Sequence, residues 1–343
     1  MKPEQSERFY IEELFSQSTQ KGLVKCNQLK EIDKLTGDAS TRRYYRLFCQ
    51  NDSYVVCLDN PTVDDIATSP FVDMQKFLEG KNIRVPKIYD MNLKRGYLLE
   101  EDLGDMTLLQ KLGQLENIQA EHEIYHKVIV ELVKLHKISA KDMAANNVVK
   151  LSFDYEKYKQ EIDFTFKFYL KLFLKVTSEE KLEELSKLFD PVLERLANEK
   201  RVLTHRDFHS RNLMVKNNEL VVIDFQDARM GIPQYDLVSL LEDCYYKVHG
   251  ENKKKLIDFY WKEMSGVDHG QKDFNKFMGF YHDMTIQRVF KAIGSFAYIY
   301  NTRKDERYLK YIGFGMEKLR VTMLKSDMYK DLRKCLFKIY YEN

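Results

Sequence analysis

"LTHRDFHSRNLMV", residues 203–215, decides how this chain is interpreted, because it places a polar stretch between apolar runs. Three of its side chains, His205, Asp207 and Asn212, lie within eight consecutive positions. A four-residue turn then leads to a second apolar run, "LVVID", which ends on Asp224. The pattern predicts two short strands around a polar loop, with a carboxylate at the end of the second apolar run.

Composition limits what the chain can do. With 343 residues, 44% hydrophobic and 31% charged, it is long enough for two domains or one large two-lobed unit. The formal net charge is only +2, so there is no global field of the kind that gathers nucleic acid or an anionic membrane. We expect neither as a partner, and any phosphate chemistry must rely on local charges. Composition indicates no oligomeric state.

The five cysteines are scattered and contain no C-x-x-C pair, which disfavours a disulfide framework or a zinc site. The first fifteen residues, "MKPEQSERFYIEELF", are charged, and no window approaches eighteen uninterrupted apolar residues. The sequence therefore predicts a cytoplasmic protein without a membrane span.

Local patterns divide the chain into a β-rich part and a helical part. Before residue 101 they predict a small sheet with two helices, and after about Thr107 the apolar spacing is mostly helical, apart from Val202 to Asp224. The predicted early elements are helices at 6–20 and 70–79 and strands at 45–49, 54–58, 85–90 and 96–103. We expect an α+β chain divided into residues 1–101 and 102–343.

The polar residues of the loop suit phosphoryl transfer from a nucleotide. That reaction needs a carboxylate to accept the proton of the attacking hydroxyl, and oxygen ligands for magnesium on the phosphates. The spacing H-R-D-x-x-x-x-N, followed by a strand that ends in Asp, supplies Asp207 as base and Asn212 and Asp224 as metal ligands. ATP and Mg²⁺ are the cofactors that this interpretation implies.

A structural explanation of the same residues is also available. H-x-D-x-x-x-x-N arises often by chance, and a His beside an Asp in a loop is commonly a local hydrogen-bonding unit. The apolar run before Asp224 and "YDLVSLL", which begins eleven residues after it, favour the catalytic interpretation.

"HRDFHSRN", "VIDFQDARMG" and "YDLVSLL" resemble the aminoglycoside phosphotransferase family, a two-lobed relative of the protein kinases. "GDASTRRYYR", "LLEEDLGD" and "IQRVFKAIGSFA" are similar, more narrowly, to bacterial anomeric sugar kinases, which phosphorylate N-acetylmuramate and N-acetylglucosamine at C1 in cell-wall recycling. The resemblance implies a protein-kinase-like fold. In such a fold, residues 1–101 would form a β-rich, nucleotide-binding N-lobe. Residues 102–343 would form a mainly helical C-lobe with the catalytic loop, metal site and substrate-binding helices. The last forty residues are uninformative.

The resemblance assigns roles around the loop. Asp207 matches the catalytic aspartate, and Asn212 and Asp224 match the magnesium ligands. His205 and Asp236 match residues that brace the loop, since an aspartate at a helix start can accept backbone N–H groups. Asp227 is either a supporting acid or an acceptor for a substrate hydroxyl.

The resemblance also places a nucleotide site in the first hundred residues. Ser40 is a candidate phosphate donor, with Arg43 or a neighbouring arginine adding charge. Glu100 and Asp102 lie in the implied hinge between the lobes, where backbone groups would bind adenine. Strand "YVVCLD" lacks the lysine that protein kinases place on the phosphates, so an arginine of "TRRYYR" is the candidate replacement.

The acceptor side is predicted from helical residues. Arg288 and Lys291 are three apart and share a helical face, where the alternative is an ordinary solvated surface. As site residues they would suit the lactyl carboxylate of N-acetylmuramate, while Glu161 would suit sugar hydroxyls.

Other functions stay open at this stage. A kinase of an aminoglycoside, choline or homoserine-like metabolite would use the same loop. An inactive nucleotide-binding pseudokinase would be expected to lose Asp207, Asn212 or Asp224, and all three are present. A protein kinase needs an activation segment, for which the eleven residues between Asp224 and Asp236 are too few.

Overall fold

The structure is a computed structural model. It describes residues 3–26, 28–35, 42–60, 69–139, 141–143, 149, 151–267 and 270–342. Contacts divide the chain into two compact units, the first formed by 1–106 with 214–226 and the second by 107–213 with 227–343. Each unit is considered by itself. The functional division at residues 101 and 102 stays a prediction. It differs from the compact units because it assigns residues 102–106 and 214–226 to the helical part.

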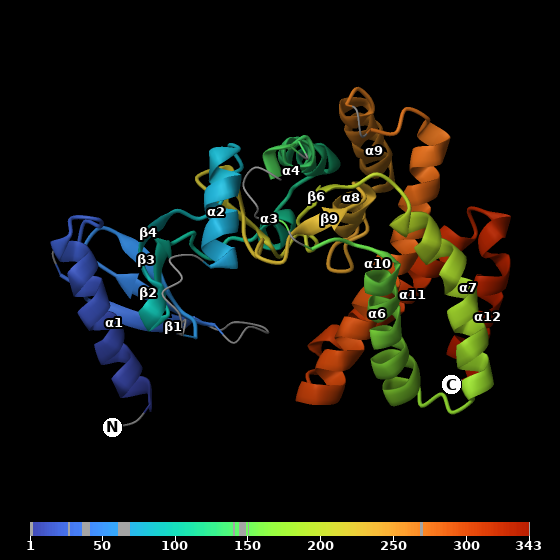
Figure 1. The fold of residues 1–343 in the computed structure, drawn as a ribbon, viewed down its shortest axis with the longest axis horizontal. Coiled ribbons are helices and arrows are strands. Elements are labelled where there is room, and N and C mark those ends of the chain that lie inside the picture. The colour runs from blue at the N-terminus through green and yellow to red at the C-terminus, as the bar shows by residue number, and fades with distance from the viewer. Residues whose placement is uncertain are drawn as a thin grey trace. The chain divides into compact units, whose positions relative to one another are not determined.

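The first unit contains a five-stranded antiparallel sheet in the order β1-β2-β3-β5-β4 (Figure 1). The strands are β1 (Glu31–Leu35), β2 (Arg43–Phe48), β3 (Ser53–Leu58), β4 (Ile88–Asn92) and β5 (Tyr97–Glu101). The prediction did not include β1. Only two of its five residues are apolar, and it lies at the sheet edge with mostly exposed side chains, so it lacks the alternation that marks a half-buried strand.

Helix α1 (Pro3–Gln20) packs on this sheet through Ile11, Leu14 and Phe15, whose spacing of three and four residues puts them on one face. They share a core with sheet residues that include Leu47 and Val56.

Helix α2 (Pro70–Gly80) begins where sequence rules predict. The hydroxyl of Ser69 accepts a hydrogen bond from the N–H of Val72, and Pro70 occupies the first helical position. One turn of 3-10 helix, η1 (Leu93–Arg95), joins β4 to β5.

Cys26 and Cys49 form a disulfide, with their Cα atoms 5.6 Å apart. This corrects the expectation that the cysteines would stay unpaired. The two positions are 23 residues apart and carry no local signal, but Cys26 precedes β1 and Cys49 follows β2, its antiparallel partner, so the fold brings them together. Among the described residues, no group of three or more His, Cys, Asp and Glu side chains is arranged to hold a metal ion.

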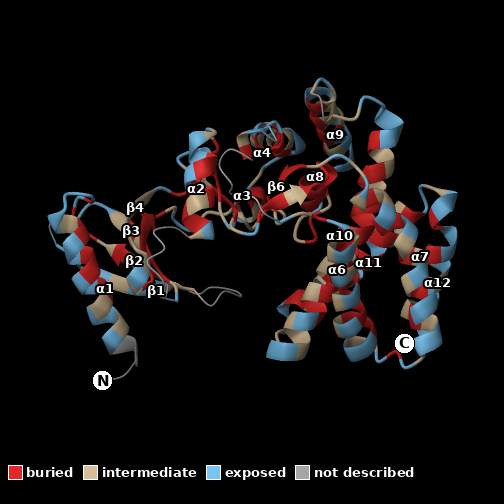
Figure 2. Cartoon of the chain, in the orientation of Figure 1, coloured by how far each residue is buried: buried red, intermediate tan, exposed pale blue. Residues whose placement is uncertain are grey.

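The second unit is mainly helical. Its longest helix is α10, which packs against α6, α7, α8 and α11, and α8 is buried along its whole length (Figure 2). The helices are α3 (Leu108–Leu112), α4 (Ile118–His136), α6 (Tyr155–Thr165), η2 (Phe166–Phe173), α7 (Glu179–Ala197), α8 (Gln234–Leu241), α9 (Gly250–Ser265), α10 (Phe274–Arg303), η3 (Glu306–Tyr308), α11 (Leu309–Met323), η4 (Asp327–Tyr329) and α12 (Lys330–Glu342). Of the helices in the described ranges, none has both the length and the apolar character needed to cross a membrane.

Two short strand pairs flank the polar loop, residues 205–212. The strands are β6 (Val202–Thr204), which pairs with β9 (Arg229–Gly231), and β7 (Leu213–Lys216), which pairs with β8 (Glu219–Val222). Thus β6 leads into the loop and β7 leads out of it. Asp224 follows the end of β8 by two residues and has a left-handed φ of 64°.

Close packing between α10 and α6 predicts a test of stability. A Cβ atom on Gly294 would lie 2.3 Å from Thr165 Oγ1 and 2.7 Å from Thr165 Cα, whereas one on Gly313, in α11, would meet nothing within 4 Å. We expect Gly294→Ala to destabilise the protein by about 1–3 kcal/mol through overpacking, and Gly313→Ala to stabilise it by up to about 1 kcal/mol through helix propensity. Urea denaturation followed by helical circular dichroism measures both. Equal effects of the two substitutions would contradict this packing.

Candidate active site

The polar loop is held at its start by the buried carboxylate of Asp236, in the first turn of α8. Asp236 accepts hydrogen bonds from the backbone N–H groups of His205, at 2.6 Å, and Arg206, at 2.9 Å. Its Oδ2 also lies 3.2 Å from Nε2 of the buried His136. Arg206 has a left-handed φ of 82°, and the two bonds to Asp236 offset part of the cost of that conformation. These contacts are the geometry expected of a brace.

A second carboxylate holds the middle of the loop. Oδ2 of the buried Asp243 accepts from the backbone N–H of Ser210, at 3.1 Å, and from the Ser210 hydroxyl. Sequence reasoning missed Asp243. Asp243 lies two residues beyond the end of α8, so no helical spacing from Asp236 marks it in the sequence.

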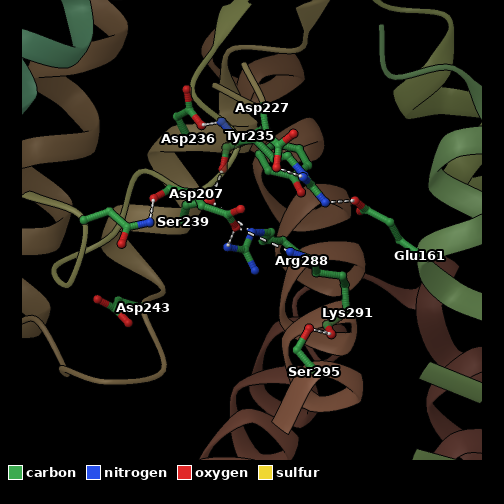
Figure 3. A network of polar contacts seen from close by, with 12 residues as sticks. Glu161, Asp207, Asp227, Tyr235, Asp236, Ser239, Asp243, Arg288, Lys291 and Ser295 are labelled. Atoms are coloured by element: carbon green, nitrogen blue, oxygen red, sulfur yellow. Dashed lines mark hydrogen bonds and ion pairs between the residues drawn. The ribbon is translucent and has the colours of Figure 1, made fainter. Parts of the chain in front are cut away.

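Asp207 faces two cations that come from α10 (Figure 3). Arg288 Nη2 lies 2.9 Å from Asp207 Oδ1, and Lys291 Nζ lies 3.4 Å from the same oxygen. The Nε of Arg288 also donates to the hydroxyl of Ser239, in α8. Arg288 and Lys291 were predicted to face the substrate, and the structure places both on the predicted base.

These cations set the protonation state of Asp207. Burial alone would raise the pKa of this carboxyl, but Lys291, Arg288 and Arg206 outweigh burial and hold the pKa well below its usual range. The Asp207 side chain keeps 25% of its surface exposed, so the carboxylate can still be reached. The Asp207 carboxylate is therefore ionised and accessible, although weakly basic.

Arg206 connects the remaining acceptor-side candidates. Its Nη1 lies 3.0 Å from Asp227 Oδ2, and its Nη2 lies 3.9 Å from Glu161 Oε1. Glu161 is buried and also accepts from Nε2 of Gln287, at 2.9 Å, while the Asp227 side chain is 57% exposed. Sequence reasoning missed Arg206 as the shared partner. The exposed Asp227 is better placed to meet a ligand than the buried Glu161.

The two predicted magnesium ligands offer oxygen donors of the hard kind that magnesium prefers. Nδ2 of Asn212 donates to the backbone carbonyl of Asp207, at 3.1 Å, which fixes the amide within the loop. Asp224 is exposed, and its Oδ1 accepts from Nε2 of Gln226 at 2.7 Å. The chemistry of both side chains fits a magnesium ion bound with part of its water shell.

The structure describes only some of the residues that were predicted to bind the nucleotide. Ser40 lies outside the described residues. Arg43 forms an ion pair with Glu7 of α1, with Nε and Oε1 2.8 Å apart, so its guanidinium is committed within the first unit. Arg46 instead pairs with Asp102, with Nε and Oδ2 3.0 Å apart, which ties β2 to the segment after β5.

The implied hinge segment has an unusual carboxyl group. Glu100 is buried in β5, and burial raises its pKa to about 7 despite the opposing effect of Arg42. The neighbouring Glu101 points to different partners, because it pairs with Lys216 at 2.9 Å and with Arg84. The Lys216 ammonium group also donates to the backbone carbonyl of Asp102, at 2.8 Å, a contact that sequence reasoning missed.

The antiparallel sheet followed by a mainly helical unit is the protein-kinase-like fold of small-molecule phosphotransferases. Solved structures share it. One is an ADP-bound aminoglycoside phosphotransferase, with a TM-score of 0.57 and 18% identity over 85% of this chain and 94% of that one. Another is the choline kinase LicA from Streptococcus pneumoniae, with a TM-score of 0.61 and 14% identity over 92% of this chain and 99% of that one.

Residues 31–254 match the phosphotransferase enzyme family known as APH, and the chain belongs to this family. It is therefore a small-molecule kinase by family. A curated relative, the N-acetylmuramate/N-acetylglucosamine kinase of Neisseria meningitidis serogroup B, is 31% identical over 273 residues, which is 79% of each chain.

The charge cluster predicts how activity depends on pH. Arg288→Gln removes a cation 2.9 Å from Asp207 Oδ1 and should raise the pKa of that carboxyl. Because the base works only when deprotonated, the acid limb of the kcat/KM profile should move to higher pH. Arg303→Gln, an exposed substitution in the same helix, should leave the profile unchanged. An acid limb at the same pH in the Arg288 variant and wild type would contradict the cluster.

Proposed function

We propose that the protein is an ATP- and Mg²⁺-dependent kinase that phosphorylates the C1 hydroxyl of N-acetylmuramate or N-acetylglucosamine in cell-wall sugar recycling. The relative named above and the family membership support this substrate class. The observation that carries the proposal is the weakly basic, ionised Asp207. We propose the cytoplasm as its location, where ATP is made.

In the proposed reaction, Asp207 accepts the proton of the C1 hydroxyl while that oxygen forms a bond to the γ-phosphorus of ATP and ADP leaves. An anomeric hydroxyl is more acidic than an ordinary alcohol, so it suits a base whose pKa is held low. Magnesium, held by Asn212 and Asp224, would neutralise charge on the phosphates. Asp236 keeps the loop in place through the His205 and Arg206 amides.

The choice between the two sugars depends on charge near Asp207. Two cations, Arg288 and Lys291, face this one carboxylate, and we propose that they also contact a substrate anion that lies beside Asp207. The lactyl carboxylate of N-acetylmuramate supplies such an anion, and N-acetylglucosamine has none. Asp227, exposed and bound to Arg206, is the better candidate for a sugar hydroxyl.

A kinase of choline or an aminoglycoside is the second candidate, because solved structures of such enzymes share the fold. Both substrates are cations, and the two cations beside Asp207, Arg288 and Lys291, disfavour them. A homoserine-like acceptor would use the same base. An inactive pseudokinase is disfavoured because Asp207, Asn212 and Asp224 are all present.

The base role predicts that Asp207→Asn loses turnover but keeps nucleotide binding. Losing a general base lowers kcat by about 10²–10⁴-fold, whereas ATP binding does not require proton transfer. Steady-state kinetics and calorimetric titration with MgATP separate the two effects. A variant that keeps most of its kcat would refute the assignment.

The metal role predicts unequal effects of two substitutions. Asp224→Ala should weaken magnesium-dependent turnover more than Asn212→Ala, because water can replace a neutral amide ligand but does not restore the lost charge. The measurement is initial rate against magnesium concentration at fixed ATP. Identical magnesium dependence in wild type and Asp224→Ala would show that Asp224 is not a ligand.

The substrate proposal predicts a sugar 1-phosphate, which phosphorus NMR distinguishes from a 6-phosphate. N-acetylmuramate should be preferred over N-acetylglucosamine by roughly 10- to 100-fold in kcat/KM, as for a partly desolvated carboxylate contact. The Arg288→Ala, Lys291→Ala double variant should lose this preference. A 6-phosphate product would contradict phosphorylation at C1. An unchanged preference in the double variant would contradict only the proposed contact between these two cations and the lactyl carboxylate.

A further inference from the structure

A cavity of 470 Å³ lies in the helical unit, and its lining does not include the residues assigned to catalysis. It is bordered by the end of α8 and by α9, α10 and α11. Much of its wall is apolar, and the apolar side chains include Leu241, Ile257, Met278, Phe314 and Val321. A cavity with such a wall can accept the apolar part of a small ligand.

The charged residues around this cavity are mostly basic. Five lysines and two glutamates line it, which gives 5 − 2 = +3, while the whole chain carries only +2. These residues are Lys247, Lys253, Lys254, Lys318, Lys325, Glu242 and Glu317. Positive charge is therefore concentrated at a cavity in a chain that is otherwise nearly neutral, which favours a negatively charged ligand.

Four of the five lysines form two groups, and the fifth, Lys247, is exposed. Lys253 and Lys318 are bound to the Glu242 carboxylate, at 2.8 and 3.4 Å, and Tyr281 donates to the same carboxylate at 2.9 Å. Lys254 and Lys325 are exposed, and within the described ranges their ammonium groups have no hydrogen bond or ion pair. Lys253 and Lys318, with Glu242 and Tyr281, form a hydrogen-bonded polar wall of the cavity. Lys254 and Lys325 can bind a ligand without breaking an existing contact.

We propose that this cavity is a second binding site, for a small organic anion that carries an apolar group. The apolar group would occupy the wall formed by α9, α10 and α11, and the anionic group would face Lys254 and Lys325. A neutral or cationic molecule of the same size lacks the charge that this rim recognises.

The polar wall of the cavity is joined to the catalytic loop by direct hydrogen bonds. Lys318 Nζ donates to the backbone carbonyl of Asp243, at 2.9 Å, and the Asp243 carboxylate holds the N–H and hydroxyl of Ser210. Ser210 lies between Asp207 and Asn212. Lys318 lies in the wall that a bound ligand contacts, and its ammonium group is hydrogen-bonded to the backbone that positions these two residues, so occupation of the cavity changes turnover.

The test uses 8-anilinonaphthalene-1-sulfonate, a fluorescent anion with an aromatic body, titrated into the full-length protein. Saturable binding should weaken at least tenfold in Lys254→Glu, Lys325→Glu. The matched control is Lys255→Glu, Lys334→Glu, which makes the same charge change at exposed lysines that do not line the cavity. The Lys254→Glu, Lys325→Glu variant changes only exposed side chains, so we expect it to fold, and circular dichroism checks this.

A second variant, Val321→Trp, fills the cavity from a partly exposed position and should also weaken binding. Saturating probe should alter kcat in wild type and have no effect in Lys254→Glu, Lys325→Glu. Equal affinities in the lysine variant and its control, or displacement of the probe by MgATP through simple competition, would overturn the site. Binding that leaves kcat unchanged would overturn the link to the loop. Because binding is measured without the sugar substrate, failure of the proposed reaction is a separate result.

Discussion

The buried carboxylate of Asp236 is the constraint on which the active site depends. It accepts two backbone N–H groups of the polar loop and lies beside the buried His136. Without it, the buried N–H of His205 and the partly buried N–H of Arg206 would lose their partner, at a cost of about 1–3 kcal/mol for the buried group. Asp243 adds a second attachment at Ser210, so α8 and the residues just after it fix the loop at its start and middle.

Fixing the loop brings Asp207 to the basic face of α10. The carboxylate then meets Arg288 and Lys291 at a single oxygen, Oδ1, and its pKa falls well below the usual range. An ionised, weakly basic carboxylate is the base proposed for an acidic hydroxyl, which connects the electrostatics of the site to the anomeric acceptor proposed for it. Arg288 and Lys291 are also the cations proposed to contact the anionic group of the sugar.

Short-range features could be predicted from the sequence. The spacing from Asp207 to Asn212, and the strand that ends before Asp224, are encoded within a few residues, and the sheet followed by helices was correctly predicted. Asp236 was identified as a brace because a carboxylate in the first helical turn commonly accepts backbone amides.

Long-range contacts could not be predicted in the same way. Arg288 lies 81 residues from Asp207, and only tertiary packing shows that it contacts the base. The disulfide of Cys26 and Cys49 depends on the pairing of β1 with β2, and β1 itself lacks a hydrophobic pattern. The roles of Arg206 and Asp243 follow from the path of a loop with left-handed backbone, which residue types alone do not specify.

The most direct test of the account is consumption of γ-labelled ATP by the purified protein, measured in parallel with N-acetylmuramate, N-acetylglucosamine, an aminoglycoside and choline. The Asp207→Asn protein supplies the background. The account predicts label transfer to the N-acetylated sugars, fastest to N-acetylmuramate, with no transfer above background to the two cations. Transfer to choline or the aminoglycoside with none to either sugar would contradict the proposed substrate and leave the kinase family as the only conclusion.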